Sequence, residues 1–289
     1  MYVPGEFEAA LHHDRSRSEL CRPARGRSGR GRALAPRAGD RTTTRQPIRI
    51  RTLGGFSVTV DGDPLRFGHK IPKRPLALLK GLIALGGDDV PEHRLTDALW
   101  SDLDGDFAHD AFTMALHRLR KLLGRREALR LCAGRLGLDR RWCWTDADAL
   151  DRLELELDSG EVAAEPTSAL LSAALDLYRG PFLAADEDDA WTFCRAEHHR
   201  QQFVRVVTTC AQRLASADSW QAVLSGCRQA IERESAAEAL YQWLMRAALR
   251  LDAASEGLAA FGRLRRMLRA LEASSPCPES LRLADQLRG

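Results

Sequence analysis

The chain has 289 residues and a formal net charge of +3, a length sufficient for about two domains. Aromatic residues make up only 6% of it, and the predominance of Ala, Leu, Arg and Glu favours a mostly helical protein. No apolar stretch approaches the roughly 18 to 20 residues of a membrane span, and the N-terminus lacks the apolar core of a secretory signal. These features predict a cytoplasmic protein with no membrane contact.

Charge is divided unevenly along the chain. Residues 109–141 hold 9 basic residues against 3 acidic ones, whereas residues 142–289 hold 16 against 23. A local basic segment beside an acidic second half indicates one defined nucleic-acid face. Residues 1–46 are rich in Arg and have no apolar period, so they predict a disordered tail. Such a tail either adds nonspecific phosphate contacts or has no role.

Short antiparallel strands and then two helices are predicted in chain order, at 48–51, 56–60, 65–67, 72–86 and 91–100. The next stretch, from His109 to Gly124, places its apolar residues on one arc of a helix and its basic residues on the other. Alone, this pattern is typical of an amphipathic helix with a solvated polar face. A predicted hairpin with glycines, reaching Trp144, follows it. Two helices, a basic helix and a hairpin are the order of a winged helix-turn-helix, whose third helix enters the DNA major groove.

The second half is predicted to be all helical. Its seven candidate helices have short breaks between them and lie at 146–157, 167–178, 189–214, 219–233, 236–251, 255–271 and 279–287. Such a series suggests stacked helical hairpins of the tetratricopeptide shape. The tetratricopeptide consensus itself is only faintly present.

Motifs of catalysis and metal binding are missing from the sequence. It contains no Walker loop, GxSxG elbow, HExxH motif or dinucleotide-binding GxGxxG. The segment that begins at Asp102 contains alternating aspartates, but it lacks the glycine and the glutamate that a calcium loop requires at fixed positions. His198 and His199 are adjacent and point about 100° apart on a helix, which argues against chelation. The seven cysteines form no CxxC pair and indicate reduced, mostly buried thiols. We therefore expect no enzyme activity, no cofactor and no metal ion.

Several segments together carry a family resemblance. LGGFSVTVDGDPL, KRPLALLKGLIALGG, LTDALW and ALHRLRKLLG are followed by YRGPFL and EALYQWLMRAAL. The first four resemble the DNA-binding half of SARP-type transcriptional activators, the antibiotic regulatory protein family, whose winged helix is similar to that of response-regulator (phosphorelay) output domains. The last two resemble the bacterial transcriptional activator domain that accompanies it. The likeness covers about residues 48–289 and omits the N-terminal tail.

After the disordered tail at 1–46 that composition predicts, the resemblance implies a DNA-binding domain at 47–145 and a tetratricopeptide-like bacterial transcriptional activator domain at 146–289. It implies a homodimer that binds direct repeats in double-stranded DNA near promoters and contacts RNA polymerase. In winged helices of this kind the loop before the third helix faces the polymerase. In this chain that loop holds Asp102, Asp104 and Asp106. The alternative for these aspartates is local capping of the helix.

Candidate DNA-contacting residues follow from the exposed arc and the wing. Arg118 resembles the family position that reaches base edges and is assigned to guanine, beside Thr113, Met114 and His117. Arg120 and Lys121 are assigned to phosphates. The wing contributes Arg135, expected at the hairpin tip, with Arg140 and Arg141. A different class of function stays open: a helical-repeat scaffold whose winged helix binds protein rather than DNA. The basic run favours DNA, since a protein-binding helix would more often carry an apolar patch.

Overall fold

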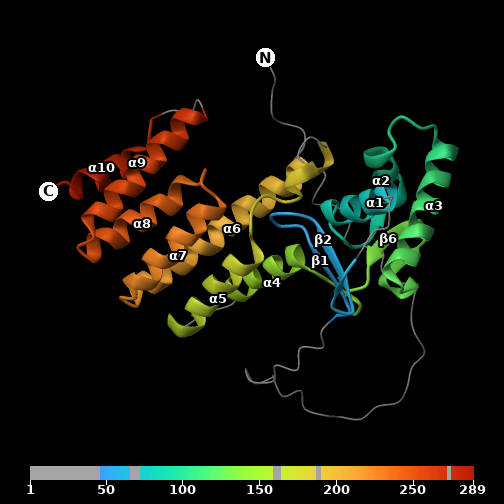
Figure 1. Ribbon diagram of the computed structural model, residues 1–289, viewed down its shortest axis with the longest axis horizontal. Helices are drawn as coiled ribbons and strands as arrows, with labels where there is room; N and C mark the ends of the chain where they lie inside the picture. Colours follow the sequence, from blue (N-terminus) through green and yellow to red (C-terminus); the bar gives the residue numbers. More distant parts are fainter. Residues whose placement is uncertain (1–45, 66–71, 159–163, 187–189, 272–274) are drawn as a thin grey trace, which may run out of the picture. The chain divides into compact units, whose positions relative to one another are not determined.

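The computed structural model describes residues 46–65, 72–158, 164–186, 190–271 and 275–289 (Figure 1). All of them belong to one unit, residues 45–289. The predicted tail at 1–46 therefore lies outside the described residues, except for Gln46. The predicted fold class is confirmed: a small sheet, three helices and a hairpin precede an all-helical part. Within the described ranges, no helix is both long and apolar enough to cross a membrane.

The first sheet combines the predicted N-terminal strands with one strand from much later in the chain. Its order is β3-β2-β1-β7, with strands at Asp63–Pro64, Ser57–Val60, Ile48–Arg51 and Cys143–Thr145. β1 and β2 are antiparallel, with Ile50 opposite Val58, and both side chains are buried. β1 and β7 are parallel. The 65–67 strand lies mostly outside the described residues, since 66 and 67 are not described.

β7 corrects the sequence analysis, which placed Trp142 to Trp144 in the wing. The strand instead pairs with β1, and the Arg49 guanidinium lies 4.0 Å from the centre of the Trp144 ring. Cys132 and Cys143, which both fall within the predicted hairpin, thus lie in different sheets. Parallel strands need a long crossover, and a local alternating pattern does not show which distant strand will be its partner.

Three helices follow the first sheet: α1 (Lys73–Ala84), α2 (Glu92–Leu99) and α3 (Gly105–Leu123). Their buried faces form one core through residues such as Leu79, Leu82, Leu95, Phe112 and Leu119. α3 begins four residues before the predicted His109 because its first residues, Gly105 to Phe107, are exposed, and a search for a buried apolar period does not detect them. It ends at Gly124, whose φ of 67° is the left-handed C-cap conformation that glycine adopts readily.

The wing is a hairpin of β5 (Leu129–Cys132) and β6 (Arg135–Leu138). Ala133 and Gly134 form its two-residue turn, both with positive φ, as in the tight turns that match strand twist. A third strand, β4 (Val90–Pro91), pairs with β6. It contains two residues, too few to show alternation in the sequence.

The second part contains the seven expected helices within the described residues: α4 (Asp146–Asp158), α5 (Ala164–Leu177), α6 (Ala190–Ser216), α7 (Trp220–Arg233), α8 (Glu238–Arg250), α9 (Ala254–Ala270) and α10 (Pro278–Gln286). From α4 to α10, each helix packs against the next one in sequence. Tyr178 and Phe203 stack in this core, with ring centres 4.2 Å apart. Gly226 allows close packing, since a Cβ there would lie 2.5 Å from the Leu171 side chain.

The first residue of α4 joins the two parts. The Asp146 carboxylate is fully buried and accepts hydrogen bonds from the backbone N–H of Thr52 at 2.8 Å and of Leu53 at 2.9 Å. The Thr52 hydroxyl donates a further bond at 2.8 Å. Burial raises the pKa of Asp146, an effect that these donors partly oppose. The end of β1 is thereby fixed to the start of the helical part.

Candidate nucleic-acid interface

One face of α3 is exposed and mainly polar. It carries Thr113, Met114, His117, Arg118 and Lys121. The opposite face is buried through Phe112, Leu116, Leu119 and Leu123. Because the buried face fixes the rotation of the helix, the exposed side chains stay available to a partner. The structure thus brings together five of the six α3 residues assigned to DNA.

Three cations on or beside this face have no hydrogen-bond or ion-pair partner among the described residues: Arg118, Lys121 and Arg126. The first two are exposed on α3, and Arg126 is exposed in the short turn that follows, Arg126–Ala128. No internal ion pair has to break when these side chains meet an anion. Arg126 was missed by the sequence analysis, and its signal is its place two residues after the helix C-cap, Gly124.

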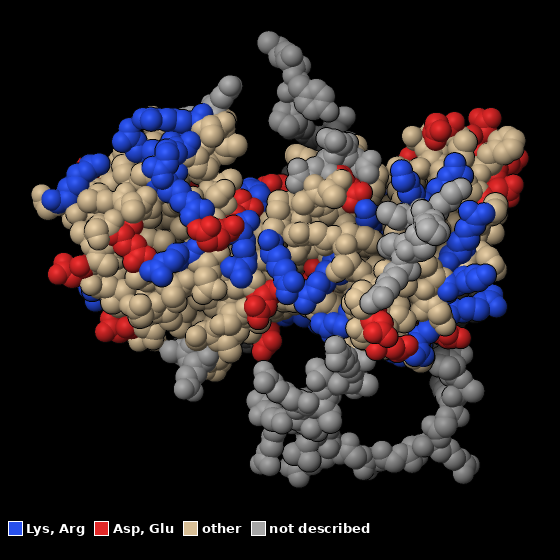
Figure 2. All heavy atoms as spheres, viewed as in Figure 1, with Lys and Arg blue, Asp and Glu red and all other residues tan. Residues whose placement is uncertain are grey.

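A hollow of about 550 Å³ lies between α3 and the wing. It is lined by Thr113, Leu116, His117, Arg120, Lys121, Gly124, Arg126 and Leu131. Figure 2 shows basic side chains gathered on the side where Figure 1 places α3. A concave surface with free cations at its wall suits a strand of phosphates.

Arg120 has a different environment from its neighbours on α3. Its Nη2 donates a hydrogen bond to the Leu129 carbonyl at 2.9 Å, and burial lowers the pKa of the guanidinium. Arg120 thereby connects α3 to β5, and its contact with phosphate stays a prediction. The helical spacing that indicated exposure could not show that the wing folds back over this position.

The arginines in the wing and just after it differ from Arg118 on α3 in being ion-paired. Each contacts a carboxylate, in the pairs Arg130–Asp88 at 3.1 Å, Arg135–Asp89 at 2.8 Å, Arg140–Asp148 at 3.4 Å and Arg141–Asp139 at 2.6 Å. Surface ion pairs of this kind are weak, about 0 to 1 kcal/mol each. Binding of phosphate by these side chains would nevertheless leave the carboxylates beside the DNA.

Arg135 does not occupy the hairpin tip as expected. Ala133 and Gly134 form the tip, and Arg135 turns back to donate to the Asp89 carbonyl at 2.7 Å. In this structure Arg135 is therefore paired with Asp89 and does not extend freely from the hairpin tip.

Arg140 and Arg141 lie beyond the wing, just before β7. Hydrogen bonds from the Arg141 guanidinium lower the pKa of Asp139 to about 2, so this pair is charged at neutral pH. The Asp139 carboxylate is nearly buried, whereas the Arg141 side chain is 80% exposed. The predicted DNA-contacting set thus separates into free cations at α3 and neutralised arginines around the wing.

The beginning of α3 is acidic. Asp102, Asp104 and Asp106 are exposed and their side chains make no hydrogen bond or ion pair with the described residues, and Phe107 beside them is 67% exposed. Asp104 is the N-cap residue, yet its side chain makes no capping hydrogen bond. Capping through that side chain is thus not observed. Asp106 lies in the first turn of α3 rather than in a loop, where the helix dipole favours a negative charge.

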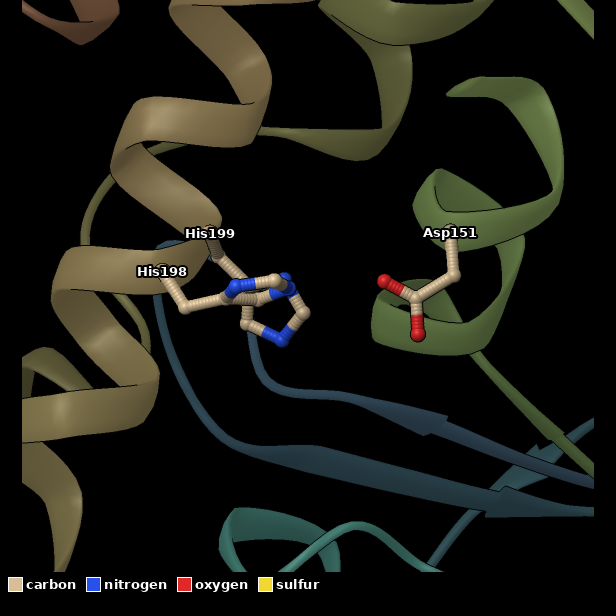
Figure 3. Close-up of side chains that lie close together, drawn as sticks. All are labelled: Asp151, His198 and His199. Carbon is tan, nitrogen blue, oxygen red and sulfur yellow. The ribbon is translucent and has the colours of Figure 1, made fainter. Parts of the chain in front are cut away.

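A cluster suited to metal ligation lies elsewhere, in the helical part. Asp151, His198 and His199 bring one potential ligand atom each to within 4.8 Å of the others (Figure 3). The argument that adjacent histidines point too far apart is therefore wrong here, because side-chain rotation brings both imidazoles toward α4. Of the described cysteines, Cys143, Cys210 and Cys227 are buried, whereas Cys132 and Cys194 are exposed. The expectation of mostly buried thiols holds for only half of them.

Comparison with known proteins identifies a known domain in the helical part of the chain. Residues 145–288 match the model of the bacterial transcriptional activator domain. No curated protein matches the chain. A solved structure of Mycobacterium tuberculosis EmbR, in complex with a low-affinity phosphopeptide, is similar with a TM-score of 0.61 and 25% sequence identity.

The EmbR likeness extends beyond the helical part. It covers 84% of this chain and 65% of the EmbR chain, so this chain spans about two thirds of that protein's length. The winged helix and the helical part are therefore matched together, in the order that the sequence resemblance implied. The chain thus carries a bacterial transcriptional activator domain at residues 145–288, and the two likenesses together support a SARP-type transcriptional activator.

Proposed function

We propose that this activator binds specific DNA sequences through α3 and its adjoining hollow. In this proposal residues 47–145 are the DNA-binding domain and residues 146–289 the activator domain. The observation that carries it is the exposed face of α3 with Arg118 and Lys121, and Arg126 just after the helix, all three free of hydrogen-bond and ion-pair partners among the described residues. Free cations beside exposed hydrogen-bonding side chains match a helix that reads the major groove while its surroundings bind phosphates.

The free cations divide into two roles by position. Arg118 is exposed at the edge of this face, next to His117 and about one helical turn from Met114, and it resembles the family position that reaches base edges, so it is assigned to guanine. Lys121 and Arg126 lie toward the end of the hollow and are assigned to phosphates. A salt-dependent gel shift on promoter fragments tests the proposal. A winged helix that binds protein instead would give no DNA complex whose affinity falls with salt.

The arrangement on DNA is proposed to be two copies side by side on a direct repeat, as the family resemblance implies. Repeats spaced about 10 to 11 base pairs would bring both α3 helices to the same side of the duplex. Inserting about half a helical turn, 5 base pairs, between the repeats is expected to abolish cooperative binding. Footprinting with a quantitative gel shift measures this.

A full-turn insertion is the control for the spacing experiment. It restores the rotational phase and is expected to return part of the cooperativity, whereas a change of length alone would affect both insertions alike. A footprint centred on an inverted repeat would contradict the side-by-side arrangement, because a two-fold dimer binds palindromic sites.

The acidic start of α3 is proposed to contact RNA polymerase. Asp104 and Arg118 are about 20 Å apart along the helix axis, so the acids need not face the phosphates. Three unpartnered carboxylates beside an exposed Phe107 form a surface that fits a basic partner. Figure 2 shows acidic side chains gathered near the loop that leads into α3.

Replacing both Asp102 and Asp104 with alanine is expected to leave operator affinity and melting temperature nearly unchanged while reconstituted transcription falls at least about tenfold. Asp110→Ala is the matched control, since Asp110 is also exposed on α3 but lies outside this group. Normal activation by the double variant would contradict the contact. A double variant that fails to fold would do the same, since the aspartates would then be structural.

A further inference from the structure

The Asp151, His198 and His199 cluster joins two helices of the activator domain. Asp151 is on α4, and both histidines are on α6. Figure 3 shows the two imidazoles and the Asp151 carboxylate directed into the same space between these helices. The potential ligand atoms lie within 4.8 Å of one another. Ligands of a tetrahedral metal ion are about 3.3 Å apart at metal–nitrogen distances near 2.0 Å, so small side-chain rotations would complete the geometry.

His199 supplies an independent sign of a ligand. Its side chain is fully buried, and its Nε2 has no hydrogen-bond partner. A buried polar atom without a partner costs free energy and calls for an explanation. The other ring nitrogen, Nδ1, lies 3.0 Å from the Gln202 Oε1.

Gln202 fixes which nitrogen of His199 carries the proton. Its Nε2 donates to the Asp151 carboxylate at 3.0 Å and to the Glu154 carboxylate at 2.8 Å, so the amide oxygen must face His199. Since that oxygen only accepts, His199 Nδ1 is the donor. In the neutral ring Nε2 then holds the free lone pair that a metal ion requires. Gln202 thus orients two of the three ligands, as outer-shell groups do in metal sites.

We propose that Asp151, His198 and His199 form a binding site for a divalent transition-metal ion, with Zn²⁺ the best match. Two imidazoles and one carboxylate are a set that zinc binds in tetrahedral geometry, with one position left for water.

The positive charge of Arg195 would weaken metal binding, so its removal tests the proposal by an expected increase in affinity. Its guanidinium lies 3.5 Å from the Asp151 carboxylate, so a bound cation would be repelled by it. Replacing Arg195 by methionine, which has similar length and no charge, should tighten metal binding several-fold. Adventitious binding to a distant surface residue would not change.

A bound ion would join α4 to α6 a short distance from Asp146, the residue that holds β1. Its expected effect is therefore on the stability of the activator domain and its junction with the DNA-binding part. Binding to the folded state alone raises the melting temperature by about 5 to 10 °C at a hundredfold excess over Kd.

The experiment uses the full chain, stripped of metal with a chelator and then titrated with Zn²⁺ by calorimetry and with Co²⁺ by visible absorption. We expect a 1:1 complex, tetrahedral Co²⁺ bands and the rise in melting temperature. His198→Gln and Asp151→Asn each remove one ligand and should weaken binding at least about tenfold. Circular dichroism of the metal-free variants verifies that they fold.

Two matched controls exclude other ligands. His93→Gln removes a histidine outside the cluster, and Cys194→Ser removes the exposed thiol one helical turn before His198. Both should bind Zn²⁺ like the parent chain. The proposal is overturned if the parent chain gives no metal response, if the response survives in His198→Gln and Asp151→Asn, or if it disappears in Cys194→Ser.

Discussion

Arg118→Ala is expected to weaken binding to the operator by about 1 to 3 kcal/mol and to relax specificity at one base pair. The physical reason is the loss of a bidentate contact to guanine from a side chain that is exposed on α3 and has no hydrogen-bond or ion-pair partner among the described residues. Binding to random DNA should change much less, since base contacts contribute little there. The measurement is a gel shift with a set of operators varied one base at a time.

Lys121→Ala is the companion variant. It is expected to weaken specific and random DNA alike and to lower the salt dependence of binding by about one unit of slope. Arg269→Ala provides the control, because Arg269 is exposed and lacks a described partner but lies on α9. Equal losses on specific and random DNA for both Arg118→Ala and Lys121→Ala would show that Arg118 contacts phosphate instead of a base.

Asp146→Ala is expected to lower the free energy of unfolding by about 3 to 5 kcal/mol. The substitution leaves the backbone N–H groups of Thr52 and Leu53 buried without an acceptor, and each such group costs about 1 to 3 kcal/mol. Urea unfolding of the full chain, followed by circular dichroism, measures the change. Since the contact joins β1 to α4, operator affinity should fall as well.

Asp148→Ala is the matched control for the junction. Asp148 lies two residues further along α4, and its carboxylate contacts only the exposed Arg140, at 3.4 Å. Its loss should cost less than about 1 kcal/mol. If Asp146→Ala and Asp148→Ala destabilised the chain equally, the buried carboxylate would not be the main connection between the two parts.

Much of this protein is determined by local pattern. The buried side of α3, with Phe112, Leu116 and Leu119, follows from helical spacing alone. The seven helices after Asp146 were predicted to within a few residues of their observed bounds. Local sequence is sufficient for these elements because a helix closes its own hydrogen bonds, and the apolar period selects the face that is buried.

Tertiary structure decided which charges are free and which distant residues meet. The sequence places basic residues from 109 to 141 in one run, but folding pairs Arg135 with Asp89 and holds Arg120 against the Leu129 carbonyl, leaving Arg118 exposed. Likewise, β7 joins β1, and Asp151 meets His198 and His199 across two helices. Such contacts depend on how whole elements pack and on side-chain rotation, and neither is encoded in the spacing of one segment.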